Sequence, residues 1–92
     1  MTQVRLTGHI VVPEADLADV KAELPIHIRL TLEEHGCLSF SVTPCAENPL
    51  RFDVHEVFTD KAAFEAHQRR VKASRWGGIT VNVERHYEIS YD

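Results

Sequence analysis

Residues 51–58, RFDVHEVF, are the stretch of sequence that decides the fold. Successive side chains of a β-strand point to opposite faces of the sheet, so Phe52, Val54 and Phe58 share one apolar face. Glu56 has the same parity, which places a carboxylate among these hydrophobic side chains. An unpaired buried carboxylate is costly and responds by raising its pKa. Glu56 is therefore predicted to have a hydrogen-bond partner inside the fold.

The segments around this strand define the rest of the fold. Alternating apolar residues predict strands at 3–12, 37–45, 50–58 and 79–91, with a hairpin turn at 44–49. Helical spacing predicts helices at 14–36 and 59–74, the first kinked or split at Pro25 and the second capped by Thr59 or Asp60. Residues 76–78 are predicted to form a loop. The order β-α-β-β-α-β predicts a single α+β domain over residues 2–91, with a ferredoxin-like antiparallel four-stranded sheet and both helices on one face.

The second predicted helix offers a partner for Glu56. His67 lies three residues after Phe64 and four before Val71, so it shares their inward-facing stripe. Glu56 lies ~10 Å back along the strand from the turn, and His67 lies ~10 Å up the returning helix. The two side chains are therefore expected to meet. Two interpretations stay open: a buried polar pair with a purely structural role, or a pair that lines a cavity and carries out acid–base chemistry.

Composition limits the classes of partner. The chain has 92 residues, of which 43% are hydrophobic and 26% charged, as in an ordinary globular protein. Its net charge of −4 lacks the basic excess of nucleic-acid binders. We expect no membrane span, no signal peptide and a cytoplasmic location. Cys37 and Cys45 are expected to stay unpaired, because one strand holds them about 25 Å apart.

The sheet face away from the helices has a mixed character. Val11 and Val57 share it with His9 and His55, which is too apolar for a face that is fully in water. A second sheet that covers this face is expected, so the sequence predicts a homodimer. The remaining histidines, His27 among them, are expected mostly at the surface or the interface.

The segments EEHGCLSFSVTP (33–44), RFDVHEVFTDKAAFEAHQRRVKAS (51–74) and ERHYEI (84–89) resemble the antibiotic biosynthesis monooxygenase family. The resemblance covers nearly the whole chain. It implies a dimeric α+β barrel and, in some members, oxidation of quinols or anthrones by molecular oxygen without a metal or flavin cofactor. His67 matches the helix histidine of the family and Glu56 its strand glutamate.

The resemblance implies a monooxygenase that acts on a quinol or a related phenolic aromatic, with His67 as the base and Glu56 orienting it. A non-catalytic dimeric protein that binds a small ligand, and an isomerase that uses the same pocket, stay open as alternatives. Haem is not expected, because Asn48 and Asn82 do not fit the pattern of the haem-degrading branch, and no metal-binding spacing is found among the histidines.

Aromatic side chains are predicted to hold the small aromatic substrate. The candidates are Phe40, Phe52, Phe64, Trp76 and Tyr87. Each has another interpretation: the phenylalanines as core, Trp76 as a plug of the core, and Tyr87 as a contact with the partner chain.

Overall fold

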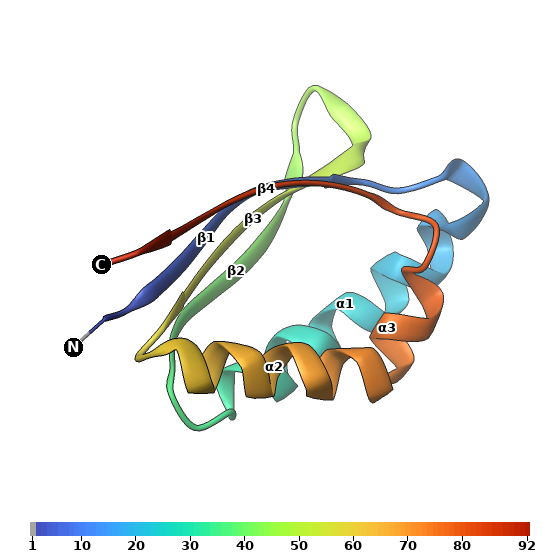
Figure 1. The fold of residues 1–92 in the computed structure, drawn as a ribbon. Helices are drawn as coiled ribbons and strands as arrows, with labels where there is room; N and C mark the ends of the chain where they lie inside the picture. The colour runs from blue at the N-terminus through green and yellow to red at the C-terminus, as the bar shows by residue number, and fades with distance from the viewer. Residues whose placement is uncertain (1) are drawn as a thin grey trace.

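The computed structural model describes residues 2–92, and its elements follow the predicted order with two short helices added (Figure 1). In chain order they are β1 (Val4–Val11), the 3-10 helix η1 (Glu14–Asp16), α1 (Leu17–Leu32), β2 (Cys37–Cys45), β3 (Asn48–Phe58), α2 (Lys61–Ala73), α3 (Arg75–Ile79) and β4 (Glu84–Tyr91). The strands form one sheet in the order β2-β3-β1-β4, with every neighbouring pair antiparallel. This is the predicted ferredoxin-like α+β fold.

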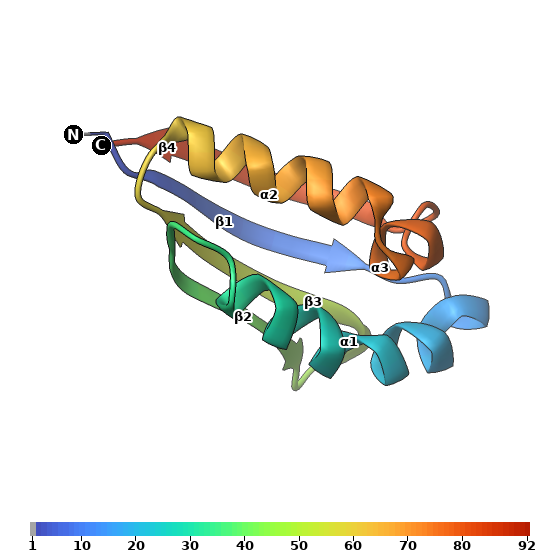
Figure 2. The ribbon, with the colours of Figure 1, turned by 90° about the horizontal axis from the view of Figure 1, so that it is seen from below.

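All the helices cover the same face of the sheet (Figure 1). Seen from the helical side in Figure 2, α1 and α2 lie side by side, with β1 visible between them. The inward face of β3 carries Phe52, Val54, Glu56 and Phe58, all of them buried, as the alternation predicts. The three hydrophobic side chains among them belong to a core that extends across β1, β2, α1, α2 and α3.

The first helix differs from its prediction in length. Pro25 lies inside α1, which stays helical through it, so of the two predicted alternatives the split into two helices does not occur. The helix ends at Leu32, earlier than expected, and Leu32 is exposed. Gly36, with φ of +90°, forms the turn into β2, a backbone conformation that glycine adopts without strain.

The segment after α2 was predicted wrongly. Residues expected to form a loop make the short helix α3, whose N-cap Ser74 accepts a hydrogen bond from the backbone N–H of Gly77 at 3.3 Å. The strand expected from residue 79 begins only at Glu84. Asn82, expected in that strand, lies in the turn before it. Trp76 consequently sits on a helix and is buried.

A close approach of β1 and β4 fixes the register of the edge strand. Gly8 pairs with Tyr87 and has φ of +153°. A Cβ atom at Gly8 would lie 1.9 Å from the carbonyl oxygen of His86, so only glycine fits. This register places Arg85 and Tyr87 on the same face as the core.

The face away from the helices carries the imidazoles of His9 and His86, stacked with ring centroids 4.6 Å apart. Val57 on this face is buried. Cys37 and Cys45, at the two ends of β2, are free thiols, as expected. Within residues 2–92, no helix is long and apolar enough to cross a membrane.

Candidate active site

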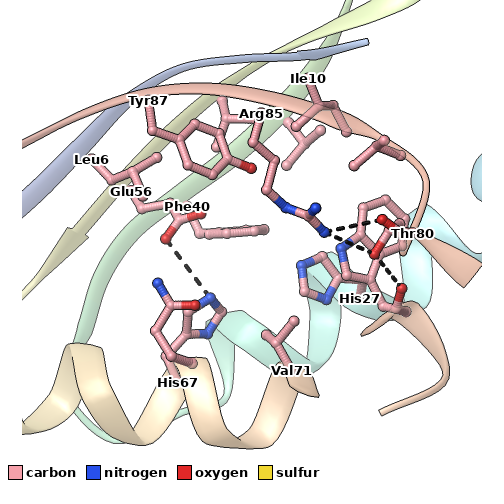
Figure 3. Close-up of a pocket in the computed structure, with 15 residues that line it drawn as sticks. Leu6, Ile10, His27, Phe40, Glu56, His67, Val71, Thr80, Arg85 and Tyr87 are labelled. Carbon is pink, nitrogen blue, oxygen red and sulfur yellow. Dashed lines mark hydrogen bonds and ion pairs between the residues drawn. The ribbon is translucent and has the colours of Figure 1, made fainter. Parts of the chain in front are cut away.

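A cavity of about 260 Å³ lies between the sheet and the helices (Figure 3). Side chains from all four strands and all three α-helices line it: Leu6, Ile10, His27, Phe40, Val42, Val54, Glu56, His67, Gln68, Val71, Trp76, Thr80, Val83, Arg85 and Tyr87. Arg85 and Tyr87 are exposed members of this set, so the cavity reaches the surface at the edge strand β4.

Glu56 and His67 meet in the cavity, as the sequence predicted. Asp60 caps α2 by accepting a hydrogen bond from the Ala63 backbone N–H at 2.8 Å, and two turns later the helix turns His67 toward the sheet. Both side chains are buried, and Nε2 of His67 lies 3.7 Å from Oε1 of Glu56. That separation is too long for a hydrogen bond. The two groups therefore face each other without bonding in the free protein.

The partner that holds His67 is Glu34, which sequence reasoning missed. Nδ1 of His67 lies 2.9 Å from Oε1 and 3.1 Å from Oε2 of Glu34. The second oxygen of Glu34 accepts a close hydrogen bond from Nε of Arg70, whose Nη2 donates to Thr31 Oγ1 at 3.0 Å. The orienting contact expected from Glu56 is thus made by Glu34.

The Glu34 contact also sets the tautomer of His67. A carboxylate that is paired with a guanidinium only accepts hydrogen bonds, so Nδ1 of His67 carries the proton. The lone pair of the neutral ring therefore lies on Nε2, the nitrogen that faces Glu56. Burial lowers the pKa of His67, and Arg70 lowers it further, against the opposing effect of Glu34. His67 is accordingly neutral near pH 7 and able to accept a proton.

The pKa of Glu56 shifts in the opposite direction to that of His67. Burial raises the pKa of its carboxyl to about 7, with a further contribution from the negative charge of Glu34. Among the described residues, no hydrogen-bond partner reaches its buried Oε1, so the prediction of such a partner is wrong for this atom. Glu56 thus changes between a neutral acid and a carboxylate near neutral pH, and one oxygen remains available to a ligand.

The predicted substrate-binding aromatics separate into two groups. Phe40, Trp76 and Tyr87 line the cavity, each from a different element. Phe52 and Phe64 do not line it. Both are buried in the core, where Phe64 packs edge-on against Phe58 with ring centroids 5.7 Å apart. The structure therefore places these two side chains in the interior packing and away from the cavity.

His27 also lines the cavity, although the sequence placed it among histidines expected mostly at the surface or the interface. It lies on the inward face of α1 and is 4% exposed. Its ring stacks on Trp76, with centroids 4.5 Å apart and planes 4° apart. Burial lowers its pKa to about 3, with further lowering by the charges of His67 and Arg70, so His27 is neutral near pH 7. Its position seven residues after buried Val20 and four before buried Thr31 was the signal available in the sequence.

The edge strand contributes the polar wall of the cavity. Figure 3 shows the Arg85 side chain reaching into the pocket toward Thr80. Its Nη2 donates to the Thr80 carbonyl oxygen at 3.1 Å and lies 3.4 Å from Thr80 Oγ1. Burial raises the pKa of Tyr87 to about 12, so the phenol stays protonated at neutral pH. In residues 2–92, no group of three or more histidine, cysteine, aspartate or glutamate side chains is placed to hold a metal ion.

Comparison with known proteins identifies a family. Residues 4–76 match the family model described as antibiotic biosynthesis monooxygenase. That range includes Glu34, Glu56 and His67 and ends before β4. No curated protein matches the sequence.

Several solved structures share the fold. A conserved protein of unknown function from Bacteroides thetaiotaomicron has a TM-score of 0.82 at 17% identity, over 99% of this chain and 98% of that one. PA3566 from Pseudomonas aeruginosa has a TM-score of 0.79 at 21% identity, over 100% and 93%. A candidate antibiotic biosynthesis monooxygenase from Nitrosomonas europaea has a TM-score of 0.73 at 16% identity, over 99% and 88%. At these identities the likeness shows the fold alone.

Proposed function

Because the chain belongs to the antibiotic biosynthesis monooxygenase family, we propose that it is a cofactor-independent monooxygenase that oxidises a quinol or a related phenolic aromatic with molecular oxygen. The observation that carries this proposal is the state of His67. It is a buried neutral imidazole whose Nδ1 is held by Glu34 and whose Nε2 faces the cavity. A base in this position can take a proton from a bound phenol.

The first step is deprotonation of the substrate. The phenolic proton passes to Nε2 of His67, and the imidazolium that forms is stabilised by the carboxylate of Glu34. Glu56 faces the same nitrogen. In its protonated form it can donate a hydrogen bond to the substrate oxygen, which would help to hold the ring in position.

The ionised ring then reduces oxygen. For hydroquinone, the overall reaction consumes one O₂ and gives hydroxyquinone and water. One oxygen atom forms a new bond to a ring carbon, the other leaves as water, and the ring supplies all the electrons. No further reductant is needed, so the protein's tasks are to bind the ring, exclude water and move the first proton.

The size of the cavity limits the substrate. A volume of about 260 Å³ lies below the range of roughly 300–1,000 Å³ that holds drug-sized ligands. A substrate with a single ring is therefore proposed. Phe40 and Tyr87, on opposite sides of β3 and β1, supply the flat walls on which such a ring can pack.

Oxygen consumption tests the proposal. Wild-type protein and a His67→Ala variant are compared on a panel of monocyclic quinols in an oxygen electrode, with the product identified by mass spectrometry. We expect loss of roughly a hundredfold or more in the alanine variant. The matched control is His35→Ala, because His35 is exposed and does not line the cavity. Equal rates in wild type and His67→Ala would overturn the proposal.

The same panel separates the other candidate functions. Conversion of substrate under nitrogen would indicate an isomerase. Saturable binding without conversion in either atmosphere would indicate a non-catalytic binding protein.

The chain is also proposed to form a homodimer through the sheet face opposite the helices. Two observations support this. That face is uncovered in the single chain (Figure 1), and it carries the apolar side chain of Val11, which is only partly buried. In addition, within residues 2–92 the outer edge of β4 pairs with no other strand, so it is open to a strand of a partner chain. Sedimentation velocity at micromolar concentration is expected to give twice the chain mass. A monomer throughout the concentration range would contradict the homodimer.

A further inference from the structure

The cavity contains an unpaired polar atom at some distance from the Glu56–His67 pair. His27 is 4% exposed, and its buried Nδ1 has no hydrogen-bond partner among the described residues. Leaving such an atom without a partner destabilises the folded state. Native proteins seldom tolerate it without a reason. Since His27 lines the cavity, a bound ligand is the partner that can satisfy it.

The orientation of the His27 ring is fixed by its aromatic neighbours. One face stacks on Trp76, and the ring lies edge-on to Phe40, with centroids 5.3 Å apart and planes 81° apart. These contacts leave the imidazole little freedom to turn, so its nitrogens point in set directions. A ring fixed in this way is already organised for a ligand.

The chemistry at this end of the cavity favours an oxygen atom. The neutral imidazole of His27 provides one N–H donor and one acceptor. Arg85 reaches the same end from β4, where Thr80 uses only one of its terminal nitrogens (Figure 3). The guanidinium carries five N–H groups in all, so Arg85 can also donate to a ligand oxygen. A hydroxyl or keto oxygen on the ligand suits a histidine and an arginine placed together.

The separation of the two histidines suits a single aromatic ring. The ring centroids of His27 and His67 lie 6.3 Å apart. Both rings line the same cavity, so one small ligand with two oxygen substituents can reach both. A diphenol can therefore place one oxygen at His67 and the other at His27.

We propose that His27, with Arg85 beside it, binds a second oxygen substituent of the substrate ring, so that the site selects diphenols over monophenols. The assignment of the first oxygen to His67 rests on the proposed function. The His27 site itself is a statement about binding and needs no turnover.

Anaerobic binding tests the proposal. Trp76 is the single tryptophan of the chain and stacks on His27, so its fluorescence reports on this part of the cavity. Hydroquinone and phenol are titrated under nitrogen into wild type and into His27→Phe, which keeps an aromatic ring against Trp76 but removes both nitrogens. His27→Gln keeps a donor and an acceptor, and the exposed His35→Phe is the matched control.

We expect wild type and the His35 variant to bind hydroquinone roughly tenfold more tightly than phenol, which is the effect of one buried hydrogen bond. His27→Phe is expected to lose most of this preference, since Arg85 alone remains to bind the second oxygen, and His27→Gln to keep more of it. An unchanged preference in His27→Phe, equal affinities in wild type, or no saturable binding of hydroquinone by wild type would each overturn the proposal.

A measurement on wild type alone covers the case in which the variants do not fold. The ¹⁵N resonances of His27 are expected to shift on addition of hydroquinone and to move much less with phenol. Equal shifts with both ligands would overturn the proposal. A protein with this selectivity that consumes no oxygen would instead overturn the monooxygenase proposal and leave the His27 site in place.

Discussion

Nδ1 of His67 on α2 lies 2.9 Å from Oε1 of Glu34, two residues beyond the end of α1, so the proposed base joins the two helices that cover the sheet. The contact holds the imidazole ring in one orientation and sets its tautomer. It also places a negative charge beside the ring, which can stabilise an imidazolium. Arg70 holds the other oxygen of the same carboxylate. A catalytic base that is positioned by a neighbouring carboxylate is a common arrangement in enzymes, and Glu34 and His67 follow it.

Glu34→Gln is expected to lower kcat by roughly a hundredfold or more, with little change in KM. The neutral amide cannot stabilise the imidazolium, and its NH₂ group can donate to Nδ1 and thereby move the ring proton to Nε2. Steady-state oxygen uptake measures the rate, and ¹⁵N spectroscopy of His67 measures the tautomer. Glu33→Gln is the control, because Glu33 is exposed and its ion pair with Arg29, at 3.7 Å, is also exposed. Equal losses in both variants would rule out a specific role for Glu34.

Glu56→Gln is expected to flatten the pH dependence of stability between pH 4.5 and about 7. The folded protein keeps the Glu56 proton up to a pKa of about 7, whereas the unfolded chain releases it near 4.5. Over this window the folded state binds more protons, so this group's contribution to stability falls as pH rises. Urea unfolding at pH 5 and pH 8 gives the difference for each variant. The exposed Glu65→Gln should behave as wild type, and a Glu56→Gln variant that did so too would contradict the buried-acid assignment.

His27→Phe is expected to retain more of its stability in acid. The pKa of His27 falls to about 3 in the folded protein, from an ordinary value of 6.5. Between these values the unfolded chain binds a proton that the folded state does not, so this group's contribution to stability is lost as pH falls from 6.5 toward 3. Urea midpoints from pH 7 to pH 4 should decline less steeply in the phenylalanine variant. His35→Phe removes an exposed imidazole and should leave the slope unchanged; identical slopes for all three proteins would contradict the prediction.

Gly8→Ala is expected to destabilise the fold by about 1–3 kcal/mol. The new methyl group would meet the carbonyl oxygen of His86 at 1.9 Å, and the backbone φ of +153° is one that alanine rarely adopts. Gly78→Ala is the matched control, because a Cβ there meets nothing within 4 Å. Denaturant unfolding should separate the two variants clearly. A Gly8→Ala protein as stable as Gly78→Ala would mean that β4 can shift relative to β1.

Much of the fold could be predicted from the regular spacing of apolar residues along the sequence. This holds for the strands, for both main helices and for the meeting of Glu56 with His67. Alternation fixes which residues of β3 face inward, and helical spacing does the same for α2. The antiparallel return of α2 under β3 then brings the two side chains to the same height.

Glu34 could not be found in this way, because it lies in the turn after α1, where no period fixes the direction of a side chain. The helix α3 was missed because its sequence, RWGGI, contains two residues of low helix propensity, and the Ser74 cap and tertiary packing override them. His27 was missed for another reason: the apolar residues of α1 do not mark its buried face, since Leu32 is exposed whereas Val20, His27 and Thr31 are buried.

The edge position of β4 has a kinetic consequence. Every residue of this strand is exposed, and it is bonded to the sheet on one side only, through β1. Yet it supplies Arg85 and Tyr87 to the cavity, whereas Glu34 and His67 are anchored on the helical layer. Transient fraying of β4 would widen the passage from solvent without disturbing the proton acceptor. Ligand exchange and the chemical step would then depend on separate parts of the molecule.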